Sequence, residues 1–327
     1  RVLTQLSASV AEVAPSLTVV VEVLLQLDLA LYRARYGRWL NGLPPGLEAE
    51  ADAPFRLKGL RHPLLVWQQQ RQGGPAVVPI SVDVSPQLRV VAITGPNTGG
   101  KTVTLKSIGL AALMARAGML LPCSEPPSLP WCAQVLADIG DEQSLQQSLS
   151  TFSGHIKRIG RILSSLQAAA SPALVLLDEV GAGTDPSEGT ALATALLKSL
   201  ADRARLTIAT THFGELKALK YEDDRFENAS VAFDSDTLSP TYALLWGIPG
   251  RSNALAIATR LGLDAQVLDR ARALLAPGGD GDVNTVIRGL EEQRQRQQAA
   301  AEDAAALLAR TELLHDELLQ RWQKHKQ

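Results

Sequence analysis

The chain has 327 residues, 46% hydrophobic and 20% charged, so it is long enough for about two domains and too apolar to be disordered throughout. Its 32 basic and 34 acidic residues give a net charge of −2, which excludes a broad basic coat for nucleic acid but leaves room for a local patch. Two cysteines, Cys123 and Cys132, exclude a disulfide scaffold, and the sequence contains no set of four Cys and His zinc ligands. A reducing, cytoplasmic setting is the default expectation.

The first 45 residues are predicted to be helical. We expect a break between two helices at Pro15-Ser16, because proline interrupts a helix, and a stop at residues 41–46, which are rich in Gly and Pro. The most apolar stretch, residues 17–31, contains three polar residues and is short for a bilayer, so we expect a buried helix and no membrane span. Since the chain begins with Arg1 and enters a helix at once, we expect a fragment of a longer protein.

A largely parallel α/β domain is predicted for residues 55–276. Short β-branched runs alternate there with helical patterns, which is typical of a parallel sheet with crossover helices. Three near-continuous apolar runs predict strands that are covered on both faces: residues 88–94, Ala173–Leu177 and Leu206–Thr210. After a second break, residues 284–327 predict one long helix, so polar that a coiled-coil or docked partner is expected.

The strongest motif follows the first of these strands. It reads Gly95-Pro96-Asn97-Thr98-Gly99-Gly100-Lys101-Thr102 and precedes a helical run that starts at Val103. Strand, glycine-rich loop and helix in this order are the context of a P-loop, whose backbone N–H groups and helix N-terminus surround phosphate groups. We therefore expect residues 95–103 to bind ATP, with Lys101 at the β- and γ-phosphates and the Thr102 hydroxyl on Mg²⁺.

Two further strands end in chemically active side chains. Ala173–Leu177 runs directly into Asp178 and Glu179. Asp178 is expected to hold the Mg²⁺ shell through water, and Glu179 to orient or deprotonate the water that attacks the γ-phosphate. Leu206–Thr210 is followed by Thr211 and His212, whose neutral imidazole can hydrogen-bond the γ-phosphate or the attacking water. Glu179 and His212 are therefore the catalytic candidates.

The order of these motifs resembles the ATPase domain of the MutS family, a branch of the ABC-type P-loop ATPases. The resemblance covers residues 61–275 and rests on the motifs T-G-P-N, S-T-F, D-E-V-G-A-G-T and T-T-H, which begin at Thr94, Ser150, Asp178 and Thr210. The chain is more similar to the second bacterial paralogue than to the mismatch-repair branch, which usually has Met and Ser at the positions of Thr98 and Thr102.

This resemblance implies a composite site formed by a head-to-tail pair of ATPase domains, so the expected partner is a second copy of the chain. Ser150 would contact the γ-phosphate bound by the partner, and Gln143 would be the Q-loop residue near Mg²⁺ and the attacking water. The loop across the dimer interface would contain Gly183, Thr184 and Asp185. Residues 247–271 would buttress the dimer, and the leading helices would end a lever connected to a DNA clamp.

The function implied is an ATP switch that hydrolyses ATP as a homodimer and acts on branched or mismatched DNA to suppress recombination. The alternative is a ribosome-splitting ATPase that binds rRNA and rescues stalled ribosomes, because both would use the same engine. A protein that binds nucleotide without turnover is a third hypothesis. Where the family places an adenine-stacking aromatic, the chain has Val77-Val78-Pro79-Ile80, which leaves the stacking residue open. Nuclease activity is expected only in missing parts of the parent protein.

Overall fold

The computed structural model of the chain contains two compact units, Arg1–Gly247 and Ile248–Gln327, which are described separately below. It describes residues 1–48, 53–95, 99–140, 151–168, 171–234, 239–250 and 254–274, together with Ala304, Leu307, Arg310 and Thr311. Those four residues are helical. The rest of the long helix that we predict for residues 284–327 lies outside the described residues.

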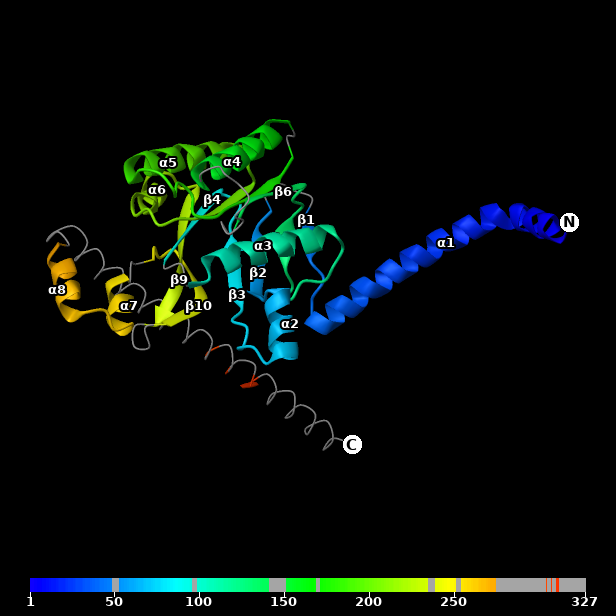
Figure 1. Cartoon of the computed structure of the whole chain (residues 1–327), viewed down its shortest axis with the longest axis horizontal. Helices are drawn as coiled ribbons and strands as arrows, with labels where there is room; N and C mark the ends of the chain where they lie inside the picture. The colour runs from blue at the N-terminus through cyan, green and yellow to red at the C-terminus, as the bar shows by residue number, and fades with distance from the viewer. Residues whose placement is uncertain are drawn as a thin grey trace, which may run out of the picture. The chain divides into compact units, whose positions relative to one another are not determined.

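The first unit begins with one helix, α1 (Val2–Leu40), which contains Pro15 in its interior (Figure 1). The predicted break at Pro15-Ser16 is therefore wrong. An interior proline removes one backbone hydrogen bond and costs about 3 kcal/mol, but the other backbone hydrogen bonds of this 39-residue helix remain, so that cost does not end it. The helix ends where the sequence predicts, at Asn41, which caps it in the left-handed conformation (φ 50°).

Most of α1 is exposed, so the predicted burial of its apolar stretch is wrong as well. Only Gly37 and Leu40 of this helix are buried. The most apolar window of 18 residues has a mean hydropathy of 1.7 and none of it is buried, so α1 is long and apolar enough to cross a membrane. Our expectation that the stretch is too short for a bilayer is therefore not supported, although a helix covered by other protein has the same length and composition.

The C-terminal turn of α1 is attached to a small mixed sheet that the sequence did not predict. Four strands form it in the order β1-β5-β2-β3: β1 (Gly46–Glu48), β5 (Ser128–Pro130), β2 (Phe55–Leu60) and β3 (Ile80–Val84). Helix α2 (Pro63–Gln72) connects β2 to β3. A Cβ atom on Gly37 would come within 2.5 Å of Leu120 Cδ1, and Arg61 donates to the Leu40 carbonyl at 2.8 Å. Close packing and a hydrogen bond thus hold the end of α1.

The second sheet of this unit has six strands and is mostly parallel, as predicted. Its strands are β4 (Val90–Thr94), β6 (Gln134–Asp138), β7 (Ala173–Leu177), β8 (Leu206–Thr210), β9 (Phe226–Asp234) and β10 (Ser239–Trp246). They lie in the order β10-β9-β4-β8-β7-β6, and the β9–β10 pair alone is antiparallel. The predicted bounds of β7 and β8 are confirmed, and β4 begins at Val90 instead of residue 88.

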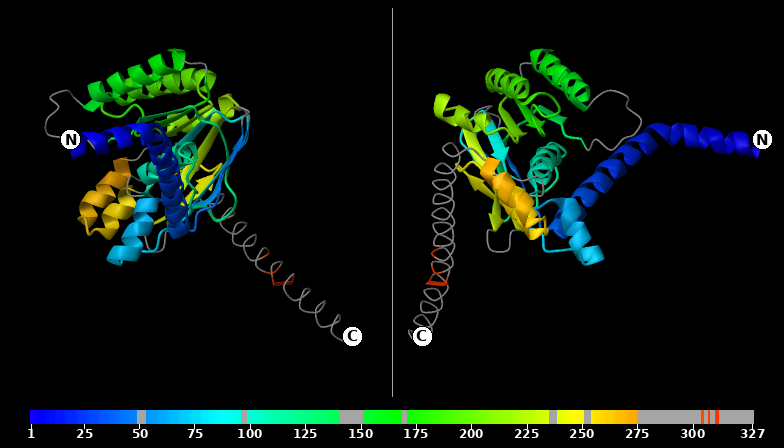
Figure 2. Two further views of the ribbon diagram at one scale, coloured as in Figure 1. Left: turned by 90° about the vertical axis from the view of Figure 1, so that its right-hand side faces the viewer. Right: turned by 60° about the vertical axis from the view of Figure 1, so that its left-hand side comes forward.

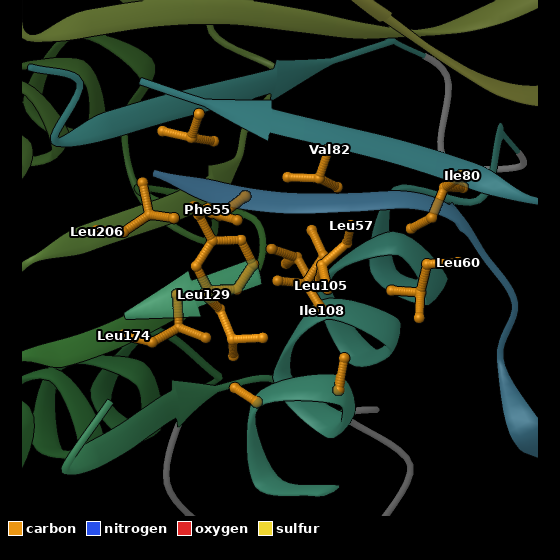
Figure 3. Close-up of a cluster of buried hydrophobic side chains, with 14 of the residues drawn as sticks. Phe55, Leu57, Leu60, Ile80, Val82, Leu105, Ile108, Leu129, Leu174 and Leu206 are labelled. Atoms are coloured by element: carbon orange, nitrogen blue, oxygen red, sulfur yellow. The ribbon is translucent and has the colours of Figure 1, made fainter. Parts of the chain in front are cut away.

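Helices cover both faces of the six-stranded sheet (Figures 1 and 2). Helix α3 (Lys101–Arg116) packs between this sheet and the small one. The other face carries α4 (Thr151–Ala168), α5 (Pro186–Arg203), the 3₁₀ turn η2 (Glu215–Ala218) and α6 (Leu219–Glu222). Leu174 of β7 belongs to the first core, as Phe55 and Leu129 do (Figure 3), whereas Val175 belongs to the second. Because successive strand residues face opposite sides, both must be apolar.

The second unit contains two short helices among its described residues, α7 (Ala254–Arg260) and α8 (Ala265–Leu274), which contact each other. Asp264 caps α8 by accepting the Gln266 N–H at 2.7 Å. Both helices fall within or next to residues 247–271, for which the family resemblance implies a buttress of the dimer. The boundaries that we predict for the lever, the ATPase domain and the C-terminal helix stay predictions.

Candidate functional site

The three sequence motifs meet at one edge of the six-stranded sheet. Strands β4, β8 and β7 are neighbours and run parallel, with Ile93 paired to Thr210 and Leu177 paired to Ala209. The carboxyl ends of parallel strands share one edge, so the chain emerges there as the glycine-rich loop, as Asp178-Glu179 and as Thr211-His212. Ligands of open α/β sheets bind at such an edge.

The loop between β4 and α3 needs glycine at both ends. Gly95 (φ 128°) and Gly100 (φ 89°) adopt backbone conformations that residues with a Cβ atom rarely reach, and Gly100 is the N-cap of α3. Gly100 has no side chain to cap the first turn, and the N-terminus of α3 carries the partial positive charge that favours an anion. Pro96, Asn97 and Thr98 lie outside the described residues, so their contact with phosphate stays a prediction.

The ammonium group of Lys101 is turned into the loop. Lys101 is 2% exposed, and its Nζ atom donates a hydrogen bond to the carbonyl oxygen of Gly95. Burial lowers the pKa of Lys101 to about 8, while the negative charges of Glu179 and Asp178 act in the opposite direction. A polyphosphate bound in the loop would add the negative charge that favours the ammonium form.

Asp178 connects the glycine-rich loop to β8. Its Oδ2 accepts a hydrogen bond from Thr102 Oγ1 at 2.7 Å, and its Oδ1 accepts one from Thr210 Oγ1 at 2.5 Å. Thr210 is fully buried. Thr210 belongs to the T-T-H motif, but no role for its side chain follows from the sequence, because residues 178 and 210 become neighbours only when β7 and β8 pair.

Glu179 is held in a strained backbone conformation next to this pair. Its φ of 52° lies in the left-handed region, which is uncommon for a residue with a Cβ atom and costs about 1–3 kcal/mol. The Glu179 N–H donates to Thr210 Oγ1 at 2.8 Å, which compensates part of that cost. The carboxylate stays 43% exposed, and Oε1 lies 3.4 Å from His212 Nε2. The two predicted catalytic candidates are therefore neighbours at an open site.

The oxygen atoms at this edge fit a small divalent cation. A hydroxyl and a carboxylate are hard oxygen ligands of the kind that Mg²⁺ prefers, and those of Thr102 and Asp178 are 2.7 Å apart. Within the part of the chain that the structure describes, no group of three or more His, Cys, Asp or Glu could hold a metal alone. Mg²⁺ commonly completes its shell with water and substrate phosphates, so the two protein ligands suffice.

A cavity of about 350 Å³ lies beside the first turn of α3. It is lined mainly by apolar groups, among them Val77 and Val78 at the place where the sequence analysis found no aromatic residue. Tyr242 of β10 also lines it, and a Cβ atom on Gly100 would lie 3.0 Å from the Tyr242 ring. Burial, together with Lys106, lowers the pKa of His62 in the same wall, so this imidazole is neutral at pH 7.

Tyr242 is the aromatic residue that the sequence analysis missed. It comes from an antiparallel edge strand far along the chain, next to an irregularity in the pairing of β9 with β10, and has a positive φ of 61°. The residues next to Tyr242 form no pattern that predicts its place in the cavity wall. The one weak indication in the sequence is an aromatic residue in a segment without a predicted role.

The loop predicted to cross the dimer interface leads into α5. Asp185 caps this helix by accepting N–H bonds from Ser187 at 2.9 Å and Glu188 at 3.2 Å. The Ser187 hydroxyl also donates to Asp185, and this bond first, then the two N–H bonds, holds the pKa of the Asp185 carboxyl below its usual value. Gly183 (φ 86°) and Thr184 precede it. Hydrogen bonds within the chain therefore hold the end of this loop at the start of α5, while its contact with a second copy stays a prediction. Gln143 and Ser150 lie outside the described residues.

The fold and the side chains at this edge define the class of protein: the chain has a P-loop ATPase-type fold, with a glycine-rich loop before α3, two oxygen atoms that could bind a metal and a carboxylate–histidine pair. The model of MutS domain V matches residues 91–277. The chain therefore belongs to the MutS family.

Relatives named Endonuclease MutS2 are similar to almost the whole chain. The one from Synechocystis sp. is 56% identical over 98% of this chain and 41% of its own length. The one from Pelotomaculum thermopropionicum is 47% identical over 97% and 38%, and one from Staphylococcus aureus is 42% identical over 99% and 43%. The chain thus spans about two fifths of the length of the curated relatives that it matches.

The burial of Lys101 predicts a characteristic pH dependence of stability. Its pKa is about 8 in the folded chain and 10.5 when unperturbed, so between these values the unfolded state binds more protons and stability rises with pH. We compare the wild type with Lys101→Met by urea unfolding at pH 7 to 10.5. Above pH 8 the free energy of unfolding of the wild type should rise relative to that of the variant, by at most about 1.4 kcal/mol per pH unit. A constant difference would show that Lys101 is not desolvated.

Proposed function

We propose that this chain is the ATP-binding and ATP-hydrolysing core of a MutS-family DNA-binding protein. The observation that carries the proposal is the hydrogen-bonded series Thr102–Asp178–Thr210–Glu179. It joins the first turn after the glycine-rich loop, a candidate general base and the edge of the sheet that carries Asp178, which we call the metal edge. A protein that merely buried these strand ends would not need a strained glutamate left open to solvent. The family membership supports a nucleotide and a divalent metal as ligands of this edge.

Hydrolysis needs binding of the phosphates, activation of water and stabilisation of charge. Residues 95–103 bind the triphosphate, and Lys101 leaves the Gly95 carbonyl for the β- and γ-phosphates. Thr102 and Asp178 would hold Mg²⁺, which would neutralise charge on the phosphate oxygens. Glu179 accepts the proton of the attacking water, and the ring of His212 hydrogen-bonds the γ-phosphate or that water. The products are ADP and phosphate.

The exposed carboxylate of Glu179 is compatible with a site completed by a second copy of the chain. In that arrangement Ser150 contacts the γ-phosphate held by the partner, Gln143 lies near the metal, and Gly183, Thr184 and Asp185 form part of the dimer interface. ATP then closes two heads, and α1 acts as the lever that transmits this change to nucleic acid. The substrate we propose is branched or mismatched DNA.

Glu179→Gln separates nucleotide binding from hydrolysis. The amide keeps the shape of the side chain but cannot accept a proton, so we expect turnover to fall about 10²-fold or more while MgATP still binds. Phosphate release measures turnover, and sedimentation with MgATP should show a dimer that persists longer than that of the wild type. Glu188→Gln in α5 is the matched control. Undiminished turnover in Glu179→Gln would contradict the role of Glu179.

Tyr242→Ala tests whether the cavity beside α3 takes the nucleobase. Stacking on an aromatic ring contributes about 1–3 kcal/mol per base, so we expect affinity for ATP to fall about tenfold. Affinity for inorganic triphosphate, measured by calorimetry, should stay within about twofold because that ligand has no base. Tyr242→Phe should retain the ATP affinity of the wild type. An equal loss for both ligands would place the base elsewhere.

Nucleic-acid stimulation distinguishes the two biological hypotheses. On the longer protein we expect branched DNA to raise the steady-state rate of ATP hydrolysis several-fold over that with linear duplex, because a closed pair of levers must fit the junction. Stalled ribosomes at the same nucleotide concentration are the comparison. A rate raised by ribosomes and not by branched DNA would reject the DNA proposal and favour the ribosome-splitting alternative.

A further inference from the structure

A buried carboxylate that the proposed reaction does not use lies beside the metal edge. Asp138 is the last residue of β6 and is 2% exposed. Two side chains of α4 converge on it. His155 Nδ1 lies 2.7 Å from Asp138 Oδ2, and Arg158 Nε donates to Asp138 Oδ1. Both carboxylate oxygens are therefore bonded to the same helix, in its second and third turns.

The direction of these bonds follows from the carboxylate. An ionised carboxylate only accepts, so the His155 Nδ1 atom must carry the proton that it donates to Asp138. The terminal nitrogen of Arg158 lies 3.3 Å from the same His155 nitrogen, but two donors cannot bond each other. His155 and Arg158 thus act as two separate donors to Asp138, and charge-assisted bonds of this kind are strong and directional.

The backbone of Asp138 belongs to the metal edge. Strands β6 and β7 pair with Asp138 opposite Leu177, and the Asp138 carbonyl accepts the Asp178 N–H at 2.9 Å. The side chain of Asp178 carries the bonds to Thr102 and Thr210. One cavity of about 360 Å³ is lined by Asp138, His155, Asp178 and Glu179, so the two groups of residues share a space.

The apolar contacts of α4 with the second core lie further along the helix. Ile162 and Leu166 are buried in the second core, whereas Ile156 near the start of the helix is 38% exposed. Apolar contacts are not directional, so they hold the helix on the sheet without determining where its first turns lie. The bonds from His155 and Arg158 to Asp138 supply that determination.

We propose that Asp138 is a positioning residue which, through His155 and Arg158, fixes the beginning of α4 relative to Asp178. This inference rests on the proposed function, because the residue that precedes α4 in the sequence is Ser150, for which we propose a contact to the partner's γ-phosphate. Through Asp138 the start of α4 and the metal carboxylate move as one unit. Each site of the dimer would thereby couple its own metal to the group that it contributes to its partner.

The first test measures hydrogen exchange of the chain without nucleotide. In His155→Ala we expect the backbone amides of residues 153–158 to exchange about tenfold faster, while those of α3 stay unchanged. His155→Asn places an N–H group near the position of Nδ1 and should restore slow exchange. Lys157→Ala, an exposed neighbour in the same turn, is the control. Unchanged exchange in α4, or faster exchange throughout the chain, would overturn the proposal.

The second test measures ATP hydrolysis by the same variants. We expect kcat of His155→Ala to fall about tenfold with KM for ATP within about twofold, and His155→Asn to recover most of kcat, because a misplaced group slows the reaction more than it weakens binding. A kcat equal to that of Lys157→Ala would overturn the inference alone. A wild-type chain without turnover, tested as the dimer, would instead overturn the proposed function, and the exchange experiment would still decide whether Asp138 holds α4.

Discussion

The carboxylate of Asp178 is the interaction on which the rest of the site depends. The carboxylate accepts hydrogen bonds from the first turn of α3 and from the end of β8. The backbone N–H of Asp178 donates to the carbonyl oxygen of Asp138 at the end of β6. Four segments that lie far apart in the chain are thus joined at one residue. This is possible only because β4, β8, β7 and β6 are consecutive in the sheet and run parallel, so that their carboxyl ends share an edge.

Two residues at the same edge have environments or conformations that cost folding free energy. Lys101 is buried with a lowered pKa, and Glu179 has a positive φ. Both cost stability in the isolated chain, and the negative charge of a bound polyphosphate would favour the ammonium form of Lys101. The core compensates for these costs, because strands with apolar side chains on both faces are packed between two helical layers.

Helix α1 exposes much of its apolar surface, and the chain matches only part of its longer relatives. Along α1 the valine and leucine side chains other than Leu40 are exposed, although an apolar composition of this kind is typical of a covered helix, and only Gly37 and Leu40 of α1 are buried. The chain also spans about two fifths of the length of its curated relatives. The described part of the first unit leaves these side chains uncovered, which fits the proposed role of α1 as a connection to other parts of a longer protein.

The sequence by itself determined the elements whose signal is contiguous. The strands Ala173–Leu177 and Leu206–Thr210, the glycine-rich loop and the mostly parallel sheet followed from apolar runs and from glycine positions, since these depend on neighbouring residues. The interruption expected at Pro15 was wrong because one proline removes a single backbone hydrogen bond, and the rest of the 39-residue helix keeps its own. Only the tertiary structure decided that Thr210 bridges Asp178 and Glu179, that Tyr242 lines the cavity at α3, and that Asp138 holds α4. These contacts join residues 17 to more than 100 positions apart, and no periodicity in the sequence encodes which distant strands become neighbours.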